Sequence, residues 1–207
     1  MGTVFNKKEL LVLLQDFHCL TGLRSAVFDS YGIEVLAYPP ELPVFCSLIR
    51  SVPEGKTGCY LCDQAACRNA TRQKKTIIYP CHAGLIEVIT PIQIDDAVVG
   101  FLLLSHIVQG EDENVEWAYA QKCCAAYDLD TNALHEAYNS LQRTPYPVLK
   151  SAADLLALAA AALYQKGMTR LASDSMQEKL SQYLATHLHE NLTSETICRA
   201  LSVSRTG

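Results

Sequence analysis

Two long β-prone runs joined by a pair of aspartates limit the folds that this chain can adopt. Leu85–Ile94 and Val98–Ile107 are almost uninterrupted apolar runs, and Asp95-Asp96 between them is typical of a turn. The pattern predicts an antiparallel hairpin. A second hairpin is predicted where two shorter β-prone runs, Ala26–Asp29 and Ile33–Leu36, flank a Ser-Tyr-Gly turn.

The order of the predicted elements indicates the fold class. Helical apolar spacing occurs before the first hairpin, over Glu9–Leu20, and again between the hairpins, over Val44–Ser51 and Gly58–Lys74, with Gly55 and Gly58 as expected breakers. A further strand is expected over Thr76–Cys81. Strands joined mainly by hairpins, with helices inserted between them, predict an α+β fold: an antiparallel sheet with helices on one face.

From Glu113 onward the sequence predicts only helices, a helical extension of the sheet domain. The last of them, over Pro147–Lys166, has Leu149, Leu156 and Leu163 at seven-residue intervals with alanines between them. This spacing is typical of a close-packed helical seam. The seam could join two chains in a homodimer or pack on the sheet of its own chain.

Composition excludes several classes of protein. The net charge of −5 argues against a nucleic-acid surface on most of this chain. No signal-peptide core is present, and the apolar run Leu155–Leu163 is far shorter than a membrane span. We therefore expect a cytoplasmic protein without membrane association, in which the nine cysteines are reduced thiols, metal ligands or redox sensors.

Cysteines are concentrated in the centre of the chain. Cys59-Tyr60-Leu61-Cys62 is a CxxC motif, a spacing that lets two thiolates hold one Zn²⁺ ion or an iron–sulfur cluster. Cys46 and Cys81 could complete such a site. Two alternatives remain open: these thiols line a ligand pocket or the core, or they sense oxidants.

The neighbours Cys81 and His82 do not indicate an enzyme. Adjacent residues on a strand point to opposite faces, which would separate the thiol from the imidazole. No orienting third group or oxyanion site is indicated either. We therefore expect no catalytic activity.

The same region carries a resemblance to a known family. The segments "TGLRSAVFDSYG", "FCSLIR" and "IYPCHAGLIEVITPI", followed by "VVGFLLL", resemble the PocR-type sensory domain, a PAS-like domain of regulators of small-carbon metabolism. The resemblance implies a short diol, alcohol or related effector held between the sheet and the central helices. The candidate ligand-binding residues are Phe45, Cys46, Cys59, Tyr79, Cys81, His82, Glu87 and His106. Asp29 is a weaker candidate, for which a role in its own turn is the favoured interpretation.

The end of the chain predicts part of a DNA-binding domain. Thr193 is placed to cap a short helix over Glu195–Leu201, and Ser204 to cap a following one. The stretch "YLATHLHENLTSETICRALSVSRT" resembles the start of the AraC-type helix-turn-helix domain. The resemblance implies DNA contacts from Ser204, Arg205 and Thr206, at the beginning of the first recognition helix.

Three parts are therefore predicted. Residues 5–110 form a PAS-like sensor, 111–175 a helical extension that signals and could dimerise, and 176–207 the beginning of an AraC-type helix-turn-helix domain. The expected function is ligand-controlled regulation of transcription in bacteria, with a small molecule and DNA as partners. The alternative is a metal- or redox-responsive switch that uses Cys46, Cys59, Cys62 and Cys81.

Overall fold

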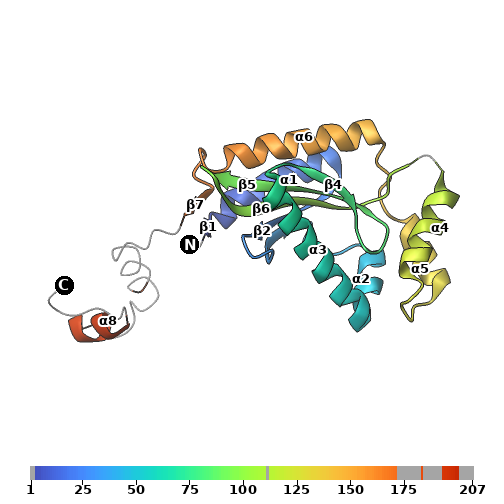
Figure 1. The fold of residues 1–207 in the computed structure, drawn as a ribbon, viewed down its shortest axis with the longest axis horizontal. Helices are drawn as coiled ribbons and strands as arrows, with labels where there is room; N and C mark the ends of the chain where they lie inside the picture. Colours follow the sequence, from blue (N-terminus) through green and yellow to red (C-terminus); the bar gives the residue numbers. More distant parts are fainter. Residues whose placement is uncertain (1–2, 111, 172–182, 184–192, 201–207) are drawn as a thin grey trace. The chain divides into compact units, whose positions relative to one another are not determined.

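A computed structural model of the chain describes residues 3–110, 112–171, 183 and 193–200 (Figure 1). The chain divides into two compact units. One is Thr3–Arg170, and the other is Leu171–Gly207 together with the first two residues. Residues 5–110 and most of 111–175, predicted as separate parts, lie within the first unit.

A five-stranded antiparallel sheet forms the centre of the first unit, which confirms the α+β class. Its strand order is β3-β2-β6-β5-β4 (Figure 1). Both predicted hairpins are present, with Val27 opposite Leu36 in one and Ile89 opposite Leu103 in the other. The strands are β2 (Arg24–Asp29), β3 (Glu34–Tyr38), β4 (Ile77–Pro80), β5 (Ile86–Ile94) and β6 (Ala97–Ile107).

Two consecutive helices connect the hairpins: α2 (Val44–Ser51) and α3 (Pro53–Gln73). Gly55 and Gly58 were expected to break the chain between them, and this was wrong, because both lie inside α3. A Cβ atom at Gly55 would collide with the carbonyl oxygen of Ile49 at the end of α2. A Cβ atom at Gly58 would lie 2.7 Å from Nδ1 of His82. These glycines therefore permit close packing rather than a turn.

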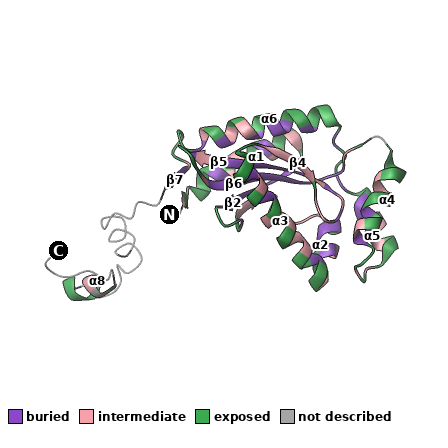
Figure 2. Cartoon of the chain, in the orientation of Figure 1, coloured by how far each residue is buried: buried purple, intermediate pink, exposed green. Residues whose placement is uncertain are grey.

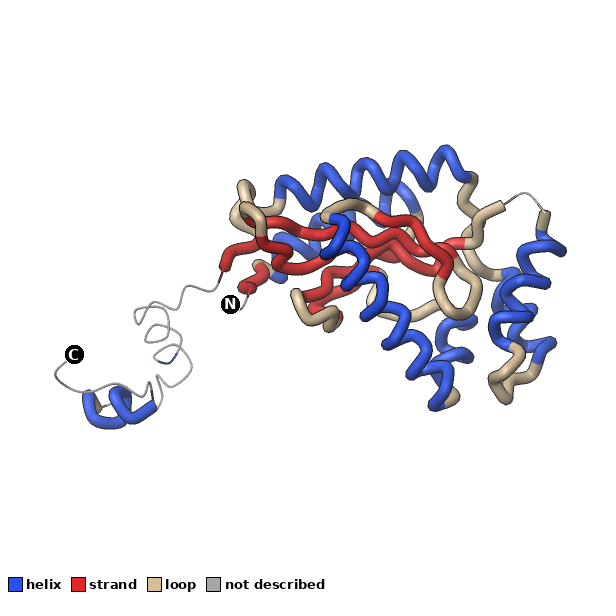
Figure 3. Tube along the Cα trace, in the orientation of Figure 1, coloured by secondary structure: helices blue, strands red, loops and turns tan. Residues whose placement is uncertain are grey.

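Helices cover both faces of the sheet, whereas the sequence predicted helices on one face. On one face, Cys67 and Ala70 of α3 share a buried cluster with Ile89 and Phe101. The next residue along β5, Thr90, faces the other way and lines a surface pocket with alanines of α6 (Tyr146–Ala162). Helix α1 (Lys7–Thr21) also packs on β2 and β3, and Figure 3 shows α6 running along the sheet. The extension after residue 110 thus supplies the second layer.

Helix α6 uses its leucine seam inside its own chain. Leu149, Leu156 and Leu163, the residues with seven-residue spacing, are all buried. Figure 2 shows the buried residues of α6 alternating with exposed ones along its length. Of the two interpretations left open, intramolecular packing therefore accounts for the seam, and a homodimer through this helix stays a prediction.

The remaining helices of the first unit lie at one end of the sheet. Helices α4 (Glu113–Cys124) and α5 (Thr131–Asn139) pack with α2 around a cluster that contains Phe45 and Tyr138. Beyond α5 the chain returns to the end of β6, where the N–H of Thr144 donates to the carbonyl of Val108. Two short strands, β1 (Thr3–Phe5) and β7 (Thr169–Leu171), form a separate two-stranded sheet.

In the second unit, the structure describes one helix, α8 (Ser194–Ala200). Thr193 caps it as predicted, because the N–H of Thr196 donates to the Thr193 hydroxyl. The Thr196 hydroxyl also accepts from the N–H of Thr193, so that threonine performs the role usually taken by Glu or Gln. Ser204, Arg205 and Thr206 lie outside the described residues.

Among the described residues, no helix combines the length and apolar character needed to span a membrane.

Replacing Leu156 by Ala tests the packing of α6. Leu156 is 2% exposed, whereas its neighbour Leu155 is 52% exposed. We expect Leu156→Ala to lower the free energy of unfolding by about 3 kcal/mol, because it leaves a cavity against the sheet. Leu155→Ala, the control, should change it by less than about 0.5 kcal/mol. Urea unfolding measures both values, and equal losses of unfolding free energy in the two variants would contradict this packing.

Candidate functional site

A small, narrow cavity lies between the sheet and the helices α2 and α3. We call it the thiol cavity. Its volume is about 20 Å³, which suits roughly one water molecule. It is lined by Cys46, Ile49, Arg50, Cys59, Cys62, Asp63, Cys81, His82, Ala83, Glu87 and His106. Six of the eight predicted ligand-binding residues therefore meet at one place.

The other two predicted residues lie outside this wall. Phe45 is fully buried beside it and packs edge-on against Tyr138. Tyr79 contacts the site through Glu87, because its hydroxyl donates to Glu87 Oε2 at 2.8 Å. Asp29 accepts hydrogen bonds from the N–H groups of Tyr31 and Ile33, and so it stabilises its own turn, as favoured.

The expectation that Cys81 and His82 point to opposite faces was wrong. Strand β4 ends at Pro80, and the following residues form a turn in which the N–H of Gly84 donates to the carbonyl of Cys81. Alternation of side chains applies only inside a strand. Within the turn, both side chains reach the thiol cavity.

Arg50 and Asp63 line the cavity although the sequence did not select them. Arg50 lies in the last turn of the short helix α2, where the side chain of a charged residue is usually solvated. Asp63 lies four residues after Cys59 on α3, a spacing that places both on the same helix face. This four-residue spacing from Cys59 is the feature of the sequence that could have identified Asp63 as a cavity residue.

Glu87 is the most deeply buried ionisable group of the cavity. Burial, and secondarily the charge of Asp63, raises the pKa of Glu87 to about 8. Its carboxyl group is therefore mainly protonated at neutral pH and can donate as well as accept a hydrogen bond. Burial also raises the pKa of Asp63 to about 6, and the positive charge of Arg50 opposes this shift. With Asp63 ionised beside Arg50, the lining carries little net charge.

The cysteines of the cavity are neutral thiols. Burial raises the pKa of Cys62 to about 11 and raises those of Cys46, Cys59 and Cys81 as well. Among the described residues, no group of three or more His, Cys, Asp or Glu side chains is arranged to hold a metal ion. Zinc or iron–sulfur binding and redox sensing by these cysteines stay predictions, which metal analysis of reduced protein can test.

Cys59 belongs to a chain of three polar side chains. Nε2 of His82 lies 3.2 Å from Cys59 Sγ, and Nδ1 of His82 lies 2.8 Å from the hydroxyl oxygen of Tyr127. Burial lowers the pKa of His82, so its ring is neutral at neutral pH. Tyr127 follows α4, and the chain therefore joins α3, the β4–β5 turn and the helical extension.

A larger groove opens on the outer side of this wall. Its volume is about 240 Å³, and it is lined by residues that include Ile33, Glu34 and Tyr60. Arg50, Cys59 and Asp63 line both this groove and the thiol cavity. These three side chains therefore form the partition between the thiol cavity and the outer groove.

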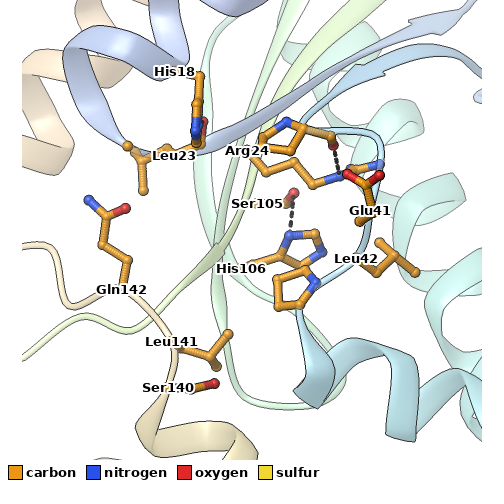
Figure 4. A pocket seen from close by; sticks show the side chains of 13 residues that line it. His18, Leu23, Arg24, Glu41, Leu42, Ser105, His106, Ser140, Leu141 and Gln142 are labelled. Carbon is orange, nitrogen blue, oxygen red and sulfur yellow. Dashed lines mark hydrogen bonds between the residues drawn. The ribbon is translucent and has the colours of Figure 1, made fainter.

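On its other side, the thiol cavity shares His106 with a second cavity of about 260 Å³ (Figure 4). The ring of His106 is held near Ser105, whose hydroxyl lies 3.2 Å from its Nδ1 atom. His106 has a φ of 67°, which is rare for a residue with a side chain. Burial lowers the pKa of His106 to about 3, so the ring is neutral. Gln142, which precedes α6, also lines this second cavity.

The comparisons with known proteins identify the family of this chain. A family model described as the sensory domain found in PocR matches residues 3–168. The chain therefore belongs to the family of PocR sensory domains, and the match includes the helical extension as well as the expected sensor segment. The regulatory protein PocR of Salmonella typhimurium strain LT2 is 25% identical over 222 residues, which cover 98% of this chain and 72% of that protein.

Among solved structures, a domain of an IclR-family transcriptional regulator covers 64% of this chain and 96% of its own, at 10% identity. Its TM-score is 0.28, and the similarity carries no argument about fold or function.

Glu87→Gln tests the protonation state of the cavity. The pKa of Glu87 is about 8 in the folded chain against 4.5 ordinarily, so the folded chain keeps a proton that the unfolded chain loses in this range. Stability from Glu87 therefore falls as pH rises from about 5 to about 8. Gln keeps an oxygen acceptor for Tyr79 and does not titrate.

We expect the free energy of unfolding of Glu87→Gln, relative to the wild type, to increase by about 2 kcal/mol between pH 6 and pH 8. Urea unfolding at several pH values measures it, and all other titrating groups are common to both proteins. A difference that stays constant over this range would show that Glu87 is ionised in the folded chain.

Proposed function

We propose that this chain is the effector-sensing region of a bacterial transcription regulator and that it binds a small neutral molecule in the thiol cavity. It acts by binding, in the cytoplasm, and not as an enzyme. Membership of the PocR sensory-domain family supports the sensing role. The observation that carries the choice of site is the convergence of polar groups on one small cavity.

The chemistry of the lining favours a neutral effector. The charges of Arg50 and Asp63 compensate each other, and Glu87 is protonated. The site therefore has no unpaired charge that could attract an ionic ligand. The protonated carboxyl of Glu87 and the neutral imidazoles of His82 and His106 are donors and acceptors suited to hydroxyl groups. A short alcohol or diol matches this set, as does a related small polar compound.

Entry of such a ligand requires the cavity to enlarge. The partition consists of side chains, and Arg50, at the end of α2, is the member best exposed to solvent. Displacement of Arg50 and Asp63 joins the outer groove to the thiol cavity. An effector then stabilises an arrangement that is poorly populated without it, which is the requirement for a ligand-driven switch.

Two contacts connect the cavity to the helical extension. The first is the hydrogen bond between His82 and Tyr127, which follows α4. The second runs along β6: His106 lies two residues before Val108, and Val108 is hydrogen-bonded to the segment that enters α6. Expansion of the cavity moves one or both side chains. In this proposal α6 passes the change along the chain to an AraC-type DNA-binding domain, of which residues 176–207 are the beginning.

A thermal-shift panel tests the proposal. We expect a short diol or alcohol to raise the unfolding midpoint of the full chain, because binding to the folded state alone adds about 2.7 kcal/mol at a hundredfold excess over Kd. Glu87→Met removes the buried carboxyl and should abolish the shift. Thr90→Val is the matched control, since it removes a buried hydroxyl from the opposite face of the same strand.

Each outcome of the panel has a definite meaning. A shift lost in Glu87→Met and kept in Thr90→Val supports binding in the thiol cavity. A shift of unchanged size in Glu87→Met would place the ligand elsewhere. If no alcohol or diol shifts the wild-type midpoint, the effector does not belong to this chemical class.

A further inference from the structure

Cys59, His82 and Tyr127 have the spacing of a nucleophile, a base and an orienting group. A neutral imidazole carries one proton on one of its nitrogens. If the Cys59 thiol donates to Nε2, then Nδ1 carries the ring proton and donates to the Tyr127 hydroxyl oxygen. In this tautomer His82 is ready to accept the thiol proton, and Tyr127 fixes the orientation of the ring.

The packing around His82 shows that this arrangement is tightly built. A Cβ atom at position 58 would lie 2.7 Å from His82 Nδ1 and 3.1 Å from the Tyr127 hydroxyl. Only glycine at position 58 leaves both groups where they are. The residue before the nucleophile thus determines how closely α3 approaches the base.

The neighbours of Cys59 also define what could react with it. Cys59 lines the outer groove as well as the thiol cavity, and a small molecule can therefore reach its sulfur from the surface. The positive charge of Arg50 lies on the same partition and lowers the pKa of Cys59, against the larger effect of burial. A cation beside the nucleophile is suited to stabilise negative charge that develops on a carbonyl oxygen.

We propose that Cys59 forms a reversible covalent adduct with a short-chain aldehyde, which makes a small carbonyl compound an effector of this sensor. The sulfur attacks the carbonyl carbon, and a C–S bond forms while the C=O π bond breaks. His82 takes the thiol proton and returns it to the new alkoxide oxygen beside Arg50. The product is a neutral thiohemiacetal, and the step needs no oxidant and releases no leaving group.

An aldehyde fits this site better than other electrophiles do. The lining carries little net charge, as a neutral ligand requires. Because the adduct is reversible, the signal ends when the aldehyde is consumed, whereas alkylation of Cys59 would be permanent. The inference rests on the proposed function, since it deepens the assignment of the thiol cavity as the effector site.

Carbon-13 NMR of the full chain with [1-¹³C]propanal tests the proposal directly. The wild type should give a resonance from the thiohemiacetal carbon, distinct from those of the free aldehyde and its hydrate, that disappears on dilution. Cys59→Ser should lose this resonance. Cys19→Ser is the matched control, because it makes the same substitution at an exposed cysteine that lines neither the thiol cavity nor the outer groove.

A second measurement examines the role of His82. We expect iodoacetamide to modify Cys59 at least tenfold more slowly in His82→Gln, because glutamine fills the position without accepting the thiol proton. Propanal should protect Cys59 of the wild type from this modification more strongly than propan-1-ol does. Peptide mass spectrometry measures the rate for Cys59 and, as an internal reference, for the exposed Cys19.

The results separate this inference from the proposed function. A thiohemiacetal resonance that persists in Cys59→Ser, or that is lost equally in Cys19→Ser, would overturn the role of Cys59. No adduct in the wild type, together with a thermal shift caused by alcohols or diols, would overturn covalent capture and leave the sensing proposal standing. The absence of both signals would contradict both.

Discussion

The close approach of α3 to the β4–β5 turn is the contact on which the geometry of the site depends. At position 58 no side chain separates the helix from His82, so the next residue, Cys59, comes within hydrogen-bonding distance of the imidazole. The same approach closes the space beneath the helix until it has the size of a water molecule. In the proposed function, so small a cavity must open to admit a ligand.

Closure of the cavity also determines its charges. A carboxylate buried as deeply as Glu87 would cost several kcal/mol without a counter-ion, and protonation avoids this cost. Arg50 is exposed, so its charge is partly hydrated, and it acts on both Asp63 and Glu87. Opening the cavity admits water and reduces the desolvation of Glu87, so cavity expansion and the protonation of this carboxyl are thermodynamically linked.

The sequence predicted most of the sheet and less of the site, for physical reasons. Runs of β-prone apolar residues and the turn residues between them are local signals, and they located both hairpins. The leucines of α6 showed that one helix face is buried but not against which surface, and the second helical layer was missed for that reason. Cys81 and His82 were separated in the prediction because β propensity does not reveal that β4 ends at Pro80. Arg50 was missed because its role depends on a tertiary contact between α2 and α3.

In the proposed function, the strained backbone at His106 is the point from which a conformational change in the cavity passes to the helical layer. A residue with a side chain at φ 67° costs on the order of 1 kcal/mol, and the surrounding contacts must offset this cost. Among the described residues, His106 is the only one that lines both the thiol cavity and the second, larger cavity. In the proposed function, a ligand that displaces the ring acts next to a backbone that is already strained. The hydrogen bonds of Val108 to the segment before α6 lie two residues further on, and they connect the end of β6 to the helical layer.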